Sequence, residues 1–88
     1  MKIFKYPLKI TDFQTLNIPE PAMPISVSEQ REELVLYCIV DPNAKTKEVR
    51  IRIVGTGHDM PADDNLKFLG TVNMFDGELM WHVFKEGE

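Results

Sequence analysis

The chain has 88 residues, one cysteine and a formal net charge of −4 at pH 7. That length suits a single domain, residues 1–88, with a small core and a thin margin of stability. A single cysteine excludes an intramolecular disulfide and fits a reducing cytoplasm. The net negative charge argues against nonspecific binding to nucleic acid. No apolar stretch is long enough to cross a bilayer, so we expect no membrane partner.

Alternation of apolar and polar residues predicts short β-strands along nearly the whole chain. The run from Leu34 to Val40 is almost continuously apolar, which predicts a central strand covered on both faces. About seven short strands and little helix predict an all-β fold, either a small antiparallel sandwich or a partly open barrel. The expected strands are Ile3–Tyr6, Gln14–Ile18, Ile25–Ser28, Leu34–Val40, Val49–Val54, Lys67–Met74 and Leu79–Phe84.

Turn-forming residues separate these strands. The run Asp41-Pro42-Asn43-Ala44 predicts a turn, because an Asp side chain bonds the backbone ahead of it and Pro presets the turn angle. Asp76-Gly77 predicts a hairpin. Pro19, Pro21 and Pro24 predict a turn or an edge strand, because proline lacks the amide donor that a central strand needs.

Helix is expected only as short local turns. Thr11–Gln14 could begin one turn with Thr11 or Asp12 as its cap, and Met60–Leu66 could hold another. The charged segment Lys85–Glu88 is expected to fray.

Six local patterns occur along the chain in a fixed order. They are Ile3-Phe4-Lys5-Tyr6-Pro7-Leu8, Ile10-Thr11-Asp12 followed by Gln14-Thr15, Val40-Asp41-Pro42, the run from Arg52 through Gly55-Thr56-Gly57-His58, Gly70-Thr71-Val72, and Trp81-His82-Val83-Phe84. With this set the sequence resembles a family of short uncharacterised proteins of tailed bacteriophages and prophages. The resemblance implies a phage origin and expression in the cytoplasm of a bacterial host, and it transfers no catalytic residue. Small accessory phage proteins often block host defence enzymes or their nucleotide signals, which is an analogy of context alone.

The best candidate for a binding site is Gly55-Thr56-Gly57-His58, which follows the alternating strand Val49–Val54. Glycine lets a backbone approach a ligand closely and turn its amides toward it. Thr56 adds a hydroxyl, and His58 can donate or accept a proton near neutral pH. Such a corner could hold a phosphate or a base edge. The alternative is that both glycines only supply turn angles and that His58 caps the loop.

Arg50 and Arg52 project from one face of the same strand, roughly 7 Å apart at about 3.3 Å rise per residue. Two guanidinium groups at this spacing could grip adjacent phosphates or a carboxylate. The alternative is an ordinary solvated strand face, which also protects the sheet from aggregation.

On the last strand, Trp81 shares a face with Leu79 and Val83, which predicts a core position where the indole N–H needs a partner. His82 lies on the opposite face with Met80 and Phe84, so we expect it half-buried or at an interface.

No spacing of His, Cys, Asp or Glu matches a metal motif, and no catalytic constellation is visible. Cys38 lies in an apolar run, which indicates a buried small hydrophobe rather than a nucleophile. We therefore expect no metal, no cofactor and no catalytic residue.

Two functions from different classes remain open. In the first, a noncatalytic homo-oligomer counters host defence by sequestering a small anionic ligand, such as a cyclic or ADP-ribose-derived signalling nucleotide. Its ligand-binding residues would be Gly55, Thr56, Gly57, His58, Arg50 and Arg52.

In the second, the protein docks on a host or phage enzyme and inhibits or assists it. The docking surface would be acidic, formed by Asp59, Asp63, Asp64, Glu29, Glu32 and Glu33.

Overall fold

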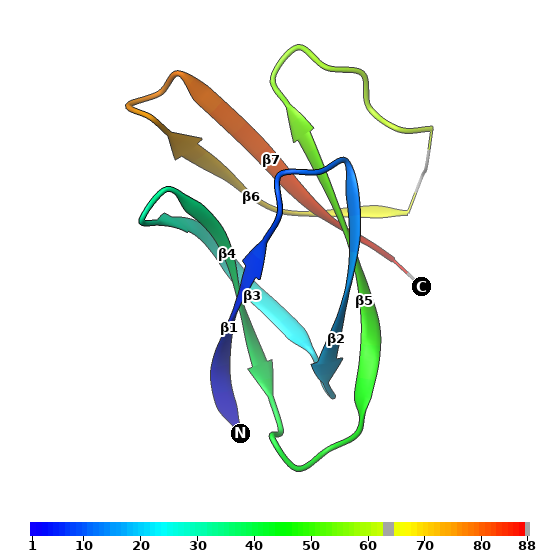
Figure 1. Cartoon of the computed structure of the whole chain (residues 1–88). Helices are drawn as coiled ribbons and strands as arrows, with labels where there is room; N and C mark the ends of the chain where they lie inside the picture. The colour runs from blue at the N-terminus through cyan, green and yellow to red at the C-terminus, as the bar shows by residue number, and fades with distance from the viewer. Residues whose placement is uncertain (63–64, 88) are drawn as a thin grey trace.

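Two antiparallel sheets form the protein in a computed structural model, which describes residues 1–62 and 65–87 (Figure 1). The first sheet has three strands in the order β1 (Lys2–Leu8), β4 (Glu33–Val40) and β3 (Met23–Gln30). The second has four strands in the order β2 (Phe13–Pro19), β5 (Thr46–Gly55), β7 (Leu79–Glu86) and β6 (Leu66–Met74). The predicted all-β fold of about seven strands is confirmed, and of the two expected architectures the protein adopts the sandwich.

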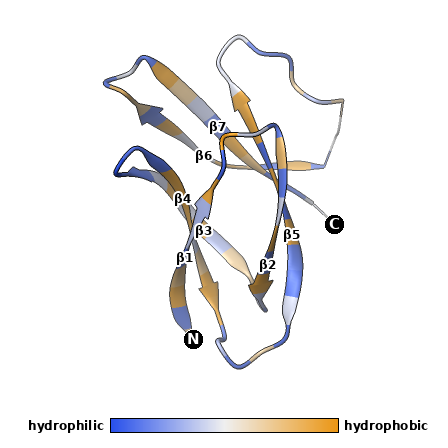
Figure 2. Cartoon of the chain, in the orientation of Figure 1, coloured by the Kyte–Doolittle hydropathy of each residue, from blue (hydrophilic) through white to orange (hydrophobic). Residues whose placement is uncertain are grey.

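The core lies between the inner faces of the two sheets. Alternate residues of β4 and β5 point inward and are almost completely buried, and the hydropathy colouring in Figure 2 follows this alternation along β5. Burying each such side chain stabilises the fold by about 1.5–3 kcal/mol. The inward residues of these two strands are Leu34, Leu36, Cys38, Val40, Val49, Ile51 and Ile53.

The run Leu34–Val40 forms a central strand as predicted, but only one of its two faces is fully buried. β4 lies in the middle of the three-stranded sheet. Its inward face is fully buried. On its outward face Val35 is buried, but Tyr37 and Ile39 keep part of their surface in solvent. The outer face of this sheet is therefore incompletely covered.

Both predicted turns with a stated chemistry are present. At the β4–β5 connection the amide of Asn43 donates to Asp41 Oδ1 and the amide of Ala44 to the Asp41 carbonyl, each at 3.0 Å. At the β6–β7 hairpin Asp76 and Gly77 have φ values of 54° and 92°, a backbone conformation that suits Asp and Gly. The proline-rich segment leads into β3, which is an edge strand.

The expected helical turn at Thr11–Gln14 is wrong. Phe13 already pairs with Arg52 of β5, so the backbone there belongs to the sheet. The Gln14 side chain closes the preceding loop instead: its Nε2 donates to the Lys9 carbonyl at 2.7 Å and its Oε1 accepts the Lys9 amide at 3.0 Å.

Two expectations for the second half of the chain also need correction. Met60, Pro61 and Ala62 contain no helix and Leu66 begins β6, while Asp63 and Asp64 lie outside the described residues. Lys85 does not fray, because β7 continues to Glu86. Glu88 is also outside the described residues. In the part of the chain that the structure describes, no helix could span a membrane.

Contacts between the two sheets are concentrated where β3 passes β6. The register of β6 against β7 shifts between Phe68 and Gly70, which is a β-bulge. A Cβ atom built on Gly70 would lie only 2.7 Å from Cγ2 of Val27 on β3. The missing side chain at position 70 therefore allows this contact between the sheets.

Gly70→Ala is expected to destabilise the protein by about 1–3 kcal/mol, because the added methyl overpacks this contact. Val27→Ala removes the clashing Cγ2 atom and should recover part of that loss in the double variant. Equilibrium denaturation of the two single variants and the double variant measures this. Strictly additive losses would contradict the proposed contact.

Cys38 provides a second test of the core. Burial raises the pKa of its thiol from 9.0 to about 11, an effect that the nearby Lys85 charge only partly opposes. The folded state therefore holds a proton that the unfolded state releases. The resulting stability is fully present below pH 9 and is lost as the pH rises toward 11. Cys38→Ala should flatten this alkaline loss in denaturation curves between pH 8 and 11, whereas an unchanged slope would contradict the assignment.

Candidate functional site

The corner after β5 is a tight turn. The His58 amide donates to the Gly55 carbonyl at 3.0 Å, and Gly57, the third residue of the turn, has φ +88°. That position of a type II turn requires positive φ, which glycine adopts at no steric cost. Gly57 therefore supplies a turn angle, which is what the alternative interpretation of this motif predicts for the glycines.

Gly55 has a different role, which is to make room for a side chain. A Cβ atom on Gly55 would lie 3.0 Å from two atoms of the His58 ring and 3.2 Å from Cζ3 of Trp81. The imidazole thus folds back over the end of β5 beside the indole. Because His58 remains exposed, its ring nitrogens stay within reach of a ligand.

The Thr56 hydroxyl is engaged with another residue. It lies 2.7 Å from Nε2 of His82, whose Nδ1 lies 2.9 Å from the hydroxyl of Thr71. His82 is half-buried on the outer face of the sheet, in agreement with one of the two expectations for it. The Thr56 hydroxyl is therefore already paired within the protein.

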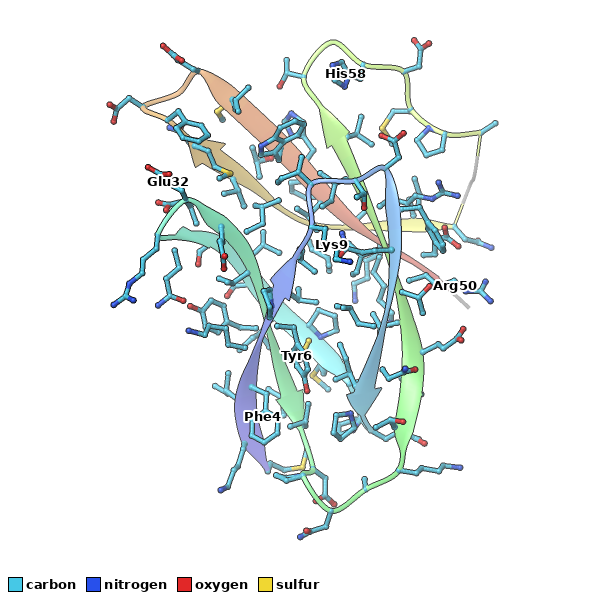
Figure 3. The ribbon with its side chains drawn as sticks, viewed as in Figure 1. Phe4, Tyr6, Lys9, Glu32, Arg50 and His58 are labelled. Atoms are coloured by element: carbon cyan, nitrogen blue, oxygen red, sulfur yellow. The ribbon has the colours of Figure 1, made fainter. Side chains whose placement is uncertain are left out.

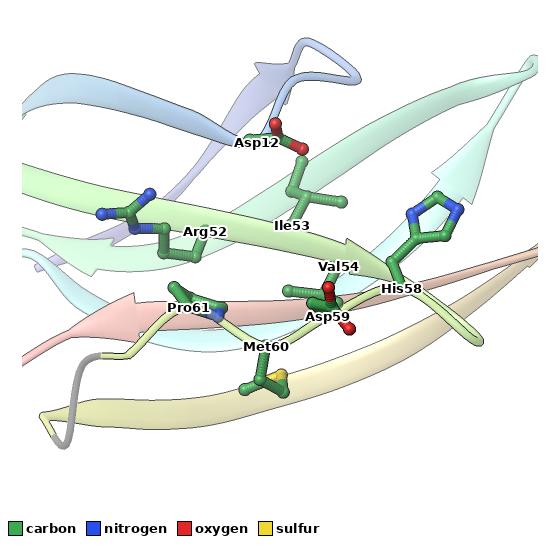
Figure 4. Close-up of a pocket in the computed structure, with 8 residues that line it drawn as sticks. All are labelled: Asp12, Arg52, Ile53, Val54, His58, Asp59, Met60 and Pro61. Carbon is green, nitrogen blue, oxygen red and sulfur yellow. The ribbon is translucent and has the colours of Figure 1, made fainter.

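Two of the six predicted residues, Arg52 and His58, line one open cavity of about 440 Å³. They lie toward opposite ends of it in Figure 4, with the loop after β5 forming one side. Arg50 does not line this cavity, and Figure 3 shows its side chain far from His58. The lining consists of Asp12, Arg52, Ile53, Val54, His58, Asp59, Met60 and Pro61.

Arg52 is held firmly in place. Its Nε donates to Glu86 at 2.8 Å, and its guanidinium carbon lies 4.8 Å from the centre of the Phe13 ring. The Arg52 and Glu86 side chains are only 29% and 13% exposed. Glu86 also lies 3.9 Å from Arg50. This carboxylate orients the arginines and partly neutralises their charge.

The cavity carries both signs of charge. Asp12 and Asp59 line it together with Arg52 and His58, between apolar side chains such as Val54. A bare phosphate would meet two carboxylates as well as two basic groups. A ligand with both phosphate and sugar hydroxyls suits the mixture better, because carboxylates accept hydrogen bonds from ribose hydroxyls.

Sequence reasoning missed Asp12, Met60 and Pro61 as parts of the site. Asp12 precedes β2, and its carbonyl accepts the Ile53 amide at 3.3 Å, which fixes it beside the end of β5. Asp12 and the end of β5 are distant in sequence, and only the pairing of β2 with β5 brings them together. The only sequence signal for Asp12 was an acidic residue just before a predicted strand.

His58 also lines a second cavity, of about 330 Å³. Gly55, Thr56 and Trp81 line it with His58. Trp81 packs against the core, as predicted, but its buried indole N–H has no hydrogen-bond partner among the described residues.

The predicted acidic surface is divided. Glu29, near the end of β3, and Glu32, in the β3–β4 turn, line a concavity of about 400 Å³ together with Phe75 and Asp76. Glu33 lines a different cavity. Asp59 belongs to the cavity that Arg52 lines, and Asp63 and Asp64 lie outside the described residues. Within residues 1–62 and 65–87 no group of three or more His, Cys, Asp or Glu residues could hold a metal ion.

Residues 1–88 match a family described as a domain of unknown function, DUF7352. The protein belongs to this family. No curated protein and no solved structure gives a significant match. Membership in DUF7352 assigns no activity and no host, so the function has to be argued from the geometry of the site.

The Arg52–Glu86 pair can be tested by a double-mutant cycle with Arg52→Gln and Glu86→Gln. We expect a coupling of about 1 kcal/mol at low salt, because both side chains are partly shielded from water, and a smaller one at 1 M NaCl. The matched control is Arg50→Gln with Glu48→Gln, whose groups lie 4.0 Å apart and are more than half exposed. Equal coupling in the two cycles would contradict the role assigned to Glu86.

Proposed function

We propose that this DUF7352 protein is a noncatalytic binding protein that captures a small anionic ligand, such as a cyclic or ADP-ribose-derived signalling nucleotide. One observation carries the proposal: Arg52, on β5, and His58, on the following loop, line the same open cavity of about 440 Å³. A volume of this size is typical of small-molecule sites.

The lining suggests how the parts of a nucleotide would be divided. Arg52 and His58 would meet phosphate oxygens, and Glu86 would keep the guanidinium oriented for them. Asp12 and Asp59 would accept hydrogen bonds from sugar hydroxyls. Capture requires affinity and no chemistry. The single cysteine is buried in the core and does not line the cavity.

The proposed setting is the cytoplasm of a phage-infected bacterium, where sequestering a signal would counter host defence. This part rests on the sequence resemblance to short phage and prophage proteins. We further propose that copies of the chain associate. The outer face of the three-stranded sheet supports this, since Ile3, Ile39 and Met23 form one cross-strand row there and Ile3 and Met23 are at least half exposed.

Differential scanning fluorimetry against cyclic oligonucleotides, cyclic ADP-ribose isomers and ordinary nucleotides tests the capture. We expect one ligand to raise Tm by several degrees, because binding to the folded state alone adds about 2.7 kcal/mol at a hundredfold excess over Kd. His58→Ala and Arg52→Ala should abolish the shift. Arg31→Ala, on the distant β3–β4 turn, is the matched control. A shift that survives both cavity variants would refute this site.

A second candidate is docking on a host or phage enzyme. It is favoured by the cluster of Glu29, Glu32 and Asp76 around Phe75, whose ring is 50% exposed. Carboxylates beside an exposed aromatic ring suit a basic protein patch with an apolar centre. The absence of any nucleotide shift, together with a stable complex with one enzyme from host lysate, would favour this candidate.

A further inference from the structure

The outer face of the four-stranded sheet carries a row of side chains of which the proposed cavity uses only Arg52. The strand registers place Phe13 opposite Arg52, Arg52 opposite Phe84, and Phe84 opposite Phe68. One cross-strand row therefore runs over β2, β5, β7 and β6. It contains three aromatic rings and one guanidinium group.

The rings of this row differ in how much surface they offer. Phe68 is 57% exposed although its ring centre lies 5.5 Å from that of Phe84, with the planes inclined at 58°. Phe84 is half-buried and supports it. Phe13 has one face occupied by Arg52. Phe68 is thus the ring with the most accessible surface, held in place by an aromatic neighbour.

Arg52 belongs both to this row and to the cavity. Two interstrand steps separate Arg52 from Phe68, which is roughly 10 Å across the sheet. A ligand with an anionic group at Arg52 and a planar apolar group reaching over Phe84 would satisfy both features. A nucleotide has this combination, and any nucleobase can stack on an aromatic side chain.

We propose that Phe68, supported by Phe84, is the platform on which a base of the captured nucleotide stacks. This inference rests on the proposed function, because the phosphate is held at Arg52 and His58. It makes the ligand one that carries a base, in contrast to a sugar phosphate or an inorganic anion.

The test is isothermal titration with cyclic di-AMP, cyclic ADP-ribose, AMP and ribose 5-phosphate, which lacks the base. Phe68→Ala should weaken binding of a base-containing probe roughly five- to a hundredfold, the effect of losing one base–aromatic stack. Phe68→Trp should retain that affinity. Phe75→Ala is the matched control, because Phe75 is similarly exposed but lies in the β6–β7 turn. Weak binding of ribose 5-phosphate should be the same in all of these variants.

The alternative outcomes separate the two proposals. If a nucleotide binds Phe68→Ala as tightly as the unaltered protein but fails to bind His58→Ala, capture stands and the stacking platform is refuted. If no probe binds the unaltered protein, both proposals fail. If sedimentation shows that Phe68→Ala converts a dimer to a monomer, the row is an interface between copies and the platform is refuted.

Discussion

The packing of two apolar strand faces, one on β4 and one on β5, is the interaction on which the rest of the structure depends. A chain of 88 residues can bury only a small apolar surface. The inward residues of these two strands, such as Leu36 and Ile51, are fully shielded from water. Because side chains alternate along a strand, committing one face to the core sends the other to solvent. The outward position of Arg52, Phe84 and His82 follows from this commitment.

At two positions, a glycine allows another residue to pack closely against the backbone, with different consequences. At Gly70 it lets β6 contact Val27 of β3, which joins the two sheets. At Gly55 it lets the His58 ring settle beside Trp81 at the end of β5. The first serves stability and the second places a titratable group at the rim of two cavities. Both depend on the space that a missing Cβ leaves.

Charge on the outer face is arranged in a way that favours a composite ligand. Glu86 accepts a hydrogen bond from Arg52, which orients that guanidinium group, and lies 3.9 Å from the more exposed Arg50. The cavity adds Asp12 and Asp59 to the basic groups. Such a mixture offers little to an isolated anion. In the proposed function, it would offer separate partners to the phosphate and the sugar of a nucleotide, and the neighbouring aromatic row would offer one to the base.

The sequence by itself determined the strands, the two turns built on Asp41 and on Asp76-Gly77, and the inward or outward side of Arg52 and Trp81, because these depend on alternation and local backbone chemistry. It also singled out the corner at His58. Only the tertiary structure decided that Arg52 and His58 share a cavity while Arg50 does not, and that Asp12 joins them. It likewise decided that Glu86 is the last residue of β7 and not part of a frayed tail. These outcomes depend on the register between strands distant in sequence, which alternation along one strand does not encode.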